Sequence, residues 1–241
     1  MATSVLENAL ILHGDSNTAR DLTCQANTVG IDFGAETQDN TALCDTTRSN
    51  QGALKTAGFS AEGFFDSDMD AALFDDVGVN GTIVTAANGK DVGERSFSLI
   101  AVAGSYQPFG GSVGELAGFS LNASARGDLE RGYVLFHSES ETATGMGATF
   151  QAGSAATSLV AILYVFSASG TTPTLDVTVE SDTADDFTGS EATRATFTQA
   201  TARTAERVVG TATSDTWYRV SYTIGGTSPD FGFAVLLIPT A

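Results

Sequence analysis

The apolar residues of this 241-residue chain recur at the spacing of β-strands, and this periodicity limits the fold more than any other feature. In residues 174–181 (TLDVTVES), apolar and polar side chains alternate, which is the pattern of a strand with one buried face. Residues 217–224 (WYRVSYTI) alternate in the same way. Residues 159–166 (LVAILYVF) and 231–238 (FGFAVLLI) are continuous apolar runs of strand length, and they predict strands covered on both faces.

Further strands are expected along most of the chain. Apolar spacing and intervening glycines place them at 8–13, 23–33, 55–65, 81–86, 95–103 and 131–139. Short strands, frequent glycine turns and little helical periodicity predict a mainly β protein, an antiparallel β-sandwich or barrel with one or two short helices. A weak helical pattern covers residues 3–10, and the Thr-rich segment 188–209 is compatible with either a helix or strands.

The clearest helical signal lies near residues 67–77. Ser67 can cap the first turn, Asp68 and Asp70 lie within that turn, and Gly78 can end the helix. Acidic side chains near a helix N-terminus interact favourably with its dipole. We therefore expect one short helix between two strands in this region.

The most loop-like stretch, residues 104–118, divides the chain near its middle. It suggests an N-terminal β-module over 1–108, with a long polar loop at 34–53, and a C-terminal β-module over 115–241. The alternative is one continuous domain. Each half has the size of an ordinary domain.

The net charge of −18 excludes several partners. The chain has 29 Asp and Glu against 11 Lys and Arg, so neither a tight grip on nucleic-acid phosphate nor an anionic membrane surface is expected. No apolar run reaches the length of a membrane span. Nine of the basic residues are Arg and two are Lys. Scattered acid with almost no Lys favours adaptation to concentrated salt, which screens self-repulsion, over an ordinary acidic protein.

No residue constellation indicates catalysis. His13 and His137 each follow an apolar run at an expected strand end, where a structural histidine with satisfied hydrogen bonds is the simpler interpretation. Cys24 and Cys44 lack metal-ligand spacing, and two buried thiols are expected in preference to a disulfide. The sequence contains no HExxH or phosphate-loop motif, and its GxSxG match, GGSVG at 110–114, lies in the loop-like stretch 104–118 rather than between a strand and a helix. We therefore expect no enzyme, and no catalytic, cofactor-binding or metal-binding residue is nominated.

Two acidic clusters and three aromatic residues are further candidates for binding sites. Residues 66–70 resemble the start of a calcium loop but lack its later Gly and Glu, so helix-capping acids are the preferred interpretation. Residues 180–186 are interpreted as a solvated loop rather than a cation site. Trp217, Tyr106 and Phe109 could stack on sugars, which would make the chain a carbohydrate-binding β-sandwich, the least favoured of the binding functions.

Several stretches resemble, in order along the chain, the major tail protein (tail tube protein) of long-tailed, non-contractile phages and archaeal viruses. They are ALILHGDSNTARDLT (9–23), DNTALCDTTRSNQGALKTAGFSAEGFFD (39–66), ERGYVLFHSESETATGMG (130–147), LDVTVESDTADDF (175–187) and WYRVSYTIGGTSPDFGFAVLLI (217–238). Each motif is common by itself, and the resemblance rests on their order and on the total length.

The resemblance implies a virion protein whose rings stack into a hollow tube through which genome DNA passes at ejection. Rings would be hexameric, or trimeric and pseudo-hexameric if the chain holds two related modules. Partners would be further copies, the tail terminator, tape measure and distal tail proteins, and sliding DNA that is not held tightly. Assembly would occur in the cytoplasm of a host that the acidity suggests to be salt-loving. The loop at 34–53 is the element expected to reach a neighbouring ring, with a simple surface loop as the alternative. A capsid decoration or turret protein is the runner-up.

Overall fold

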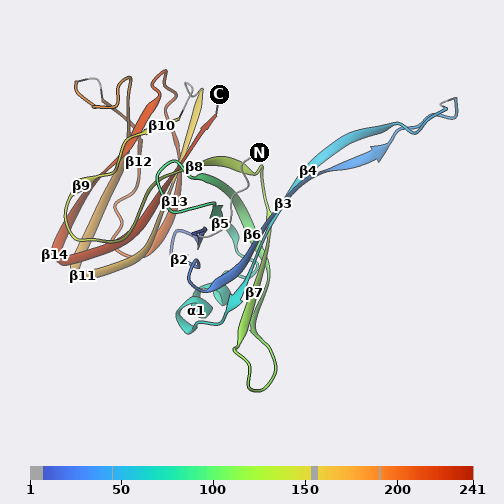
Figure 1. Cartoon of the computed structure of the whole chain (residues 1–241), viewed down its shortest axis with the longest axis horizontal. Coiled ribbons are helices and arrows are strands. Elements are labelled where there is room, and N and C mark those ends of the chain that lie inside the picture. Colours follow the sequence, from blue (N-terminus) through green and yellow to red (C-terminus); the bar gives the residue numbers. More distant parts are fainter. Residues whose placement is uncertain (1–7, 45, 153–156, 190, 241) are drawn as a thin grey trace.

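The computed structural model describes residues 8–44, 46–152, 157–189 and 191–240. These residues form antiparallel strand pairs and one short helix, so the prediction of a mainly β protein is confirmed. The 14 strands form one hydrogen-bonded network, whose main path runs β12–β11–β14–β8–β6–β5–β1–β2 (Figure 1). Among the described residues, no helix is long and apolar enough to cross a membrane.

The elements have the following bounds: β1 Leu10–Gly14, β2 Ala19–Asp21, β3 Ala26–Asp39, β4 Asn50–Phe64, α1 Ser67–Asp75, β5 Asn80–Ala87, β6 Arg95–Gly110, β7 Gly118–Ala125, β8 Glu130–Glu141, β9 Gly145–Met146, β10 Phe150–Gln151, β11 Ser158–Asp182, β12 Ala192–Thr196, β13 Thr204–Gly210 and β14 Trp217–Thr240.

The strands β11 and β14 form one long ribbon that bends in its middle. Pairing continues along their full length, with register shifts where the chain turns near residues 166–174. The sequence predicted four separate strands here, whereas the structure has two continuous bent ones. Gly170 and Gly226 adopt φ values of +115° and +111° at the bend, and a Cβ on either would lie 2.7 Å from a backbone oxygen of the opposite strand. Only glycine fits such positions without strain.

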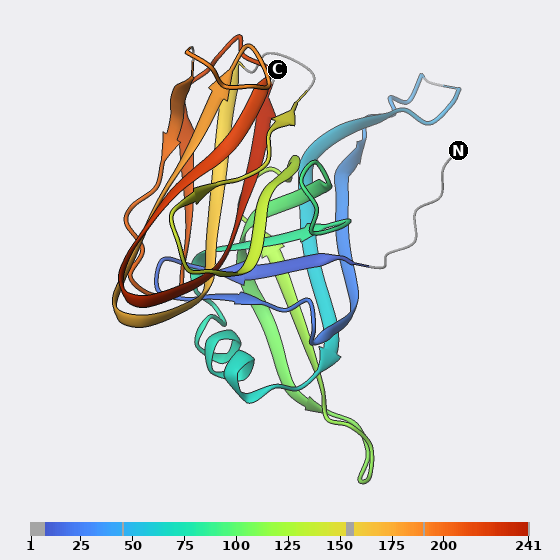
Figure 2. The same ribbon diagram turned by 60° about the vertical axis from the view of Figure 1, so that its left-hand side comes forward.

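The bend folds the ribbon into a sandwich (Figures 1 and 2). Leu159 and Leu163 from the first half of β11 share a core with Val177 and Val179 from its second half. The other face of the first half, which includes Tyr164, packs in a separate core against β1 and β5. Residues 159–166 are thus covered on both faces, as their continuous apolar run predicts.

The N-terminal strands form a further layer around a third core. There β4 and β7 cover one face of β5 and β6, and Met69 and Leu73 of α1 complete the packing. The long strand β6 pairs with β8 and β5 at its start and with β7 at its end, so it joins the N-terminal strands to the C-terminal sandwich. The expected boundary at 108–115 runs into the tip of the β6–β7 hairpin, where Gly110 pairs with Gly118. β7 therefore groups with the strands that precede it.

The helix lies where the sequence predicts it, with a different cap. Asp66 rather than Ser67 is the N-cap, and its Oδ1 accepts hydrogen bonds from the backbone N–H groups of Asp68 (2.9 Å) and Met69 (3.1 Å). A carboxylate satisfies two of the free N–H groups that open a helix, and it also interacts favourably with the dipole. The interpretation of residues 66–70 as helix-capping acids is therefore confirmed for Asp66.

The described part of segment 188–209 contains strands rather than a helix, because β12 and β13 pair along β11. The weak helical pattern at 3–10 mostly falls outside the described residues, and Leu10 begins β1.

Candidate assembly surfaces

The most prominent feature of the surface is a two-stranded arm, defined here as residues 32–57. β4 pairs with β7 only as far as Gly58, opposite Ser124, and beyond that point β3 and β4 have only each other (Figure 1). The sequence predicted a loop at 34–53. The structure instead continues both strands through most of that range and leaves a turn between Asp39 and Asn50.

The turn at the end of the arm is held by polar contacts. Asp39 accepts a hydrogen bond from the backbone N–H of Thr41 (2.9 Å), and its other oxygen lies 3.1 Å from Nε of Arg48. The backbone N–H of Ser49 donates to Oγ1 of Thr41 (2.9 Å). The hydrogen bonds from Thr41 hold the pKa of Asp39 below its ordinary value. These contacts join the two ends of the turn beside the last paired residues of β3 and β4.

One face of the arm continues the apolar face of the core into solvent. Ile31 pairs with the buried Phe59, and the next residue of β3 on that face, Phe33, is 55% exposed. Elsewhere on the arm, Leu54, on the opposite face of the ribbon, is 76% exposed, and Leu43, in the turn, is fully exposed. Large exposed apolar side chains on one element indicate a contact surface for another molecule.

The outer edge of β3 is also open. β4 is its only partner among the described strands, so one row of backbone N–H and C=O groups along 14 residues faces away from the sheet. Natural edge strands are commonly protected by Pro or Lys, and β3 contains neither. An edge of this kind can accept a strand from another chain.

A second hairpin, formed by β6 and β7, projects from another part of the body (Figure 2). Its tip exposes Phe109, Val113 and Leu116, of which Val113 is fully exposed. The ring of Phe109 packs on that of Phe65 with 4.6 Å between centroids, which fixes the base of the tip to the start of the helical segment. The chain thus carries two projecting hairpins with uncovered apolar side chains.

Most basic side chains are used within the chain. Seven of the eleven Lys and Arg residues form ion pairs with carboxylates: Arg20, Arg48, Lys90, Arg194, Arg203, Arg207 and Arg219. Only Asp76, Asp182 and Asp215 are buried among the described acids. The accessible surface is therefore dominated by negative charge that no cation of the same chain neutralises.

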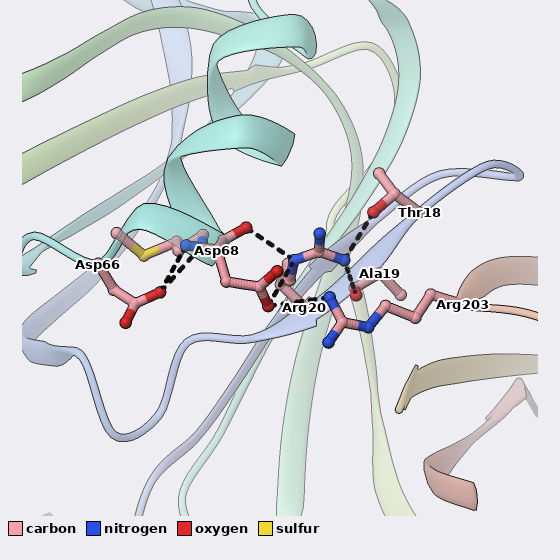
Figure 3. A network of polar contacts seen from close by, with 7 residues as sticks. Thr18, Ala19, Arg20, Asp66, Asp68 and Arg203 are labelled. Atoms are coloured by element: carbon pink, nitrogen blue, oxygen red, sulfur yellow. Dashed lines mark hydrogen bonds and ion pairs between the residues drawn. The ribbon is translucent and has the colours of Figure 1, made fainter. Parts of the chain in front are cut away.

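One polar network joins the N-terminal elements α1 and β2 to the C-terminal sandwich (Figure 3). Asp68 at the start of α1 accepts a hydrogen bond from Nη1 of Arg203 (2.9 Å), and its backbone oxygen accepts one from Nε of Arg20 (3.2 Å). Arg20 lies on β2 and also donates to Thr18 and to the backbone of Ala19. The hydrogen bond from Arg203 lowers the pKa of Asp68. This network connects α1, β2 and the turn before β13.

Each of the two histidines lies beside an aspartate inside the fold. His13 is 1% exposed, and its Nδ1 lies 3.5 Å from Oδ2 of Asp76, which follows α1. Burial lowers the pKa of His13 to about 4 and raises that of Asp76 to about 6. His137 lies beside Asp21, with 3.8 Å between Nε2 and Oδ2. Both histidines lie within the fold, but neither ring nitrogen of His13 has a hydrogen-bond partner among the described residues, so the expectation of a satisfied histidine is wrong there.

The other sites considered from sequence do not form. Cys24 and Cys44 are free and exposed, so the expected burial is wrong; Cys44 lies on the arm and Cys24 just before β3. Trp217 lies on β14, while Tyr106 and Phe109 lie on β6, so these aromatics do not share a platform. No group of three or more His, Cys, Asp or Glu suited to a metal ion occurs among the described residues.

Comparisons with known proteins assign no family to the chain. No protein-family model matches it, and no curated protein matches it. A solved structure of the virion of a native gene transfer agent particle contains a chain 22% identical, with a TM-score of 0.39, over 50% of this chain and 94% of that one. A tail of an empty gene transfer agent particle, with C6 symmetry, contains a chain 20% identical, with a TM-score of 0.39, over 50% and 92%. The Dit protein of phage SPP1 is 10% identical, with a TM-score of 0.36, over 98% and 100%.

Proposed function

We propose that this chain is a structural, non-enzymatic virion protein whose rings stack into the tube of a non-contractile viral tail. The observation that carries the proposal is the arm, a lone two-stranded ribbon with exposed apolar side chains and an open edge. The ordered resemblance of five segments to tail tube proteins supports the same function.

The arm is suited to a role in assembly because no other described element of the chain packs against it. An isolated two-stranded hairpin is at best marginally stable in water, and packing on a further surface is what usually stabilises one. Covering Phe33 and Leu54 removes apolar area from water, and pairing along β3 satisfies its open backbone groups. A contact between the arm and a different face of a second copy is heterologous, and repeated contacts of that kind form rings or continuous stacks.

The charge is compatible with DNA passing through such a tube. Phosphate and carboxylate repel each other, so a wall carrying acidic side chains lets DNA slide without sticking. Four basic side chains, Lys55, Arg95, Arg126 and Arg131, form no ion pair with a described carboxylate, too few for a wide phosphate-binding surface. The proposed ring is hexameric, or trimeric and pseudo-hexameric.

Electron microscopy of the concentrated protein tests the proposal. Stacked rings or tubes are expected. Discrete trimers or pentamers would favour a capsid decoration or turret protein instead, and a monomer at every concentration would overturn an assembly function.

Deletion of residues 37–51 tests the arm itself. It joins Glu36 to Gly52, which lies opposite the neighbouring Thr37 in the ladder, so the body is expected to keep its circular dichroism spectrum and monomeric size. Tube growth is expected to stop. As a point change, Leu54→Asp is expected to weaken growth, whereas Val209→Asp, at a 64% exposed valine of β13 outside the arm, is the matched control. Normal tubes from the deletion would refute the role of the arm.

A further inference from the structure

A groove of about 590 Å³ lies at the seam between β6, β8 and the end of β14. Its walls include Arg95, Arg131, Tyr133 and the carboxylates Asp128 and Glu130. Glu130 is bound by Arg207 from β13, and this ion pair leaves it unavailable to the groove arginines. Two of the four basic side chains that form no ion pair with a described carboxylate therefore line one groove, together with the exposed Asp128, for which no ion pair with a described residue occurs.

The two arginines are placed by the pairing of β6 with β8. Arg95 lies opposite Tyr133, and Phe97 lies opposite Arg131, so both arginines project from the same face one diagonal step apart. The guanidinium of Arg95 lies over the ring of Tyr133, with 4.1 Å from its central carbon to the ring centroid. Stacking orients the guanidinium while its N–H groups at the rim stay available.

We infer that this groove receives the carboxylates of the arm of a second copy, Asp32 and Glu36. This inference rests on the proposed assembly function and names a receiving site for the arm. Asp32 and Glu36 are exposed on β3 and form no ion pair with a described residue. A planar guanidinium binds a carboxylate through two parallel hydrogen bonds, which gives both attraction and a defined orientation.

Charge complementarity supports an acidic occupant of the groove. Negative side chains cover most of the molecule, so two copies repel one another except where an unpaired cation faces an unpaired acid. The groove offers two guanidinium groups that form no ion pair with a described carboxylate, while Asp32 lies at the base of the arm, opposite Gly58, and Glu36 lies four residues farther out along β3. Arg residues held on aromatic rings are typical centres of binding energy at protein interfaces.

A charge-swap experiment tests the inference, with assembly followed by light scattering and electron microscopy. Arg95→Glu with Arg131→Glu is expected to raise the protein concentration needed for assembly at least tenfold, and so is Asp32→Arg with Glu36→Arg. A chain that carries all four changes is expected to assemble near the concentration of the unchanged protein. Circular dichroism establishes that each variant is folded.

Arg126→Glu is the matched control for Arg131→Glu. Both arginines are exposed and form no ion pair with a described carboxylate, and the two substitutions change the charge equally. Only the second change, in the groove, is expected to impair assembly. Failure of the four-change chain to recover, or equal effects of the two single changes, would overturn the inference while tubes of the unchanged protein preserve the proposed function. A protein that never assembles would overturn both.

Discussion

The buried contact between His13 and Asp76 leads to a prediction about stability and pH. The perturbation is Asp76→Asn, which keeps the side-chain shape and removes the charge. His13 is 1% exposed and Asp76 is 4% exposed, with 3.5 Å between Nδ1 and Oδ2. Neither ring nitrogen of His13 forms a hydrogen bond to the described residues.

His13 makes the folded state less stable in acid. Burial lowers its pKa from 6.5 to about 4, so between these values the unfolded chain binds a proton that the folded chain does not. Its contribution is fully present above pH 6.5 and is lost as the pH falls through 4. The difference between the two pKa values corresponds to about 3 kcal/mol of unfolding free energy.

Asp76 acts in the opposite direction over nearly the same range. Burial, followed by the charges of Asp15 and Asp75, raises its pKa from 3.8 to about 6. The folded chain therefore binds the proton more tightly, and this contribution is present below pH 3.8 and lost as the pH rises through 6. In the unchanged protein, the effects of His13 and Asp76 largely offset each other between pH 4 and 6.

Removing Asp76 exposes the effect of His13. The unfolding free energy of Asp76→Asn is expected to fall by about 3 kcal/mol more than that of the unchanged protein between pH 6.5 and 4. Urea unfolding followed by circular dichroism measures this, provided that the dependence on urea concentration stays constant. Asp91→Asn, an exposed change elsewhere, is the control. Parallel pH profiles for Asp76→Asn and the unchanged protein would refute the reasoning.

Two further predictions concern the core and the surface. Val177→Asp and Val235→Asp should each prevent soluble folding, because a buried unpaired charge costs several kcal/mol, comparable with the whole stability of a domain; both valines are at most 1% exposed. Soluble yield and circular dichroism measure this, with the exposed Val209→Asp as control, and a normally folded variant would disprove the core assignment. Thermal melting is expected to occur at a higher temperature in molar KCl than in dilute buffer, since salt screens the unpaired acids; equal melting temperatures would remove the argument for salt adaptation.

The sequence predicts the core strands well because burial imposes periodicity. Residues 174–181 alternate since only one face packs, and residues 159–166 are apolar throughout since both faces do. The continuity of β11 through residues 166–174 could not be predicted in this way. Its bend brings positive φ values and polar residues into the middle of a strand, and locally these resemble a turn that ends one.

The arm illustrates where periodicity fails. Alternation arises when one face of a strand is buried, and residues 32–39 are exposed on both faces. From the sequence alone, the Gly, Asp and Glu content of these residues therefore predicts a loop. The exposure of Cys44 was missed for the same reason, because burial was expected of a segment that has no core beside it.

The features that the fold leaves incomplete lie on its projecting and peripheral parts. Much of the body is internally satisfied, as Asp66 caps the helix, Asp68 pairs with two arginines, and the apolar runs fill three cores. The open edge of β3, the exposed apolar residues of both hairpins and the unpaired Arg95 and Arg131 are satisfied by nothing described in the chain. For a chain of charge −18, attraction between copies requires local complementarity, so a few unpaired cations determine where a neighbour can bind. The proposed self-assembly would cover all of these surfaces together.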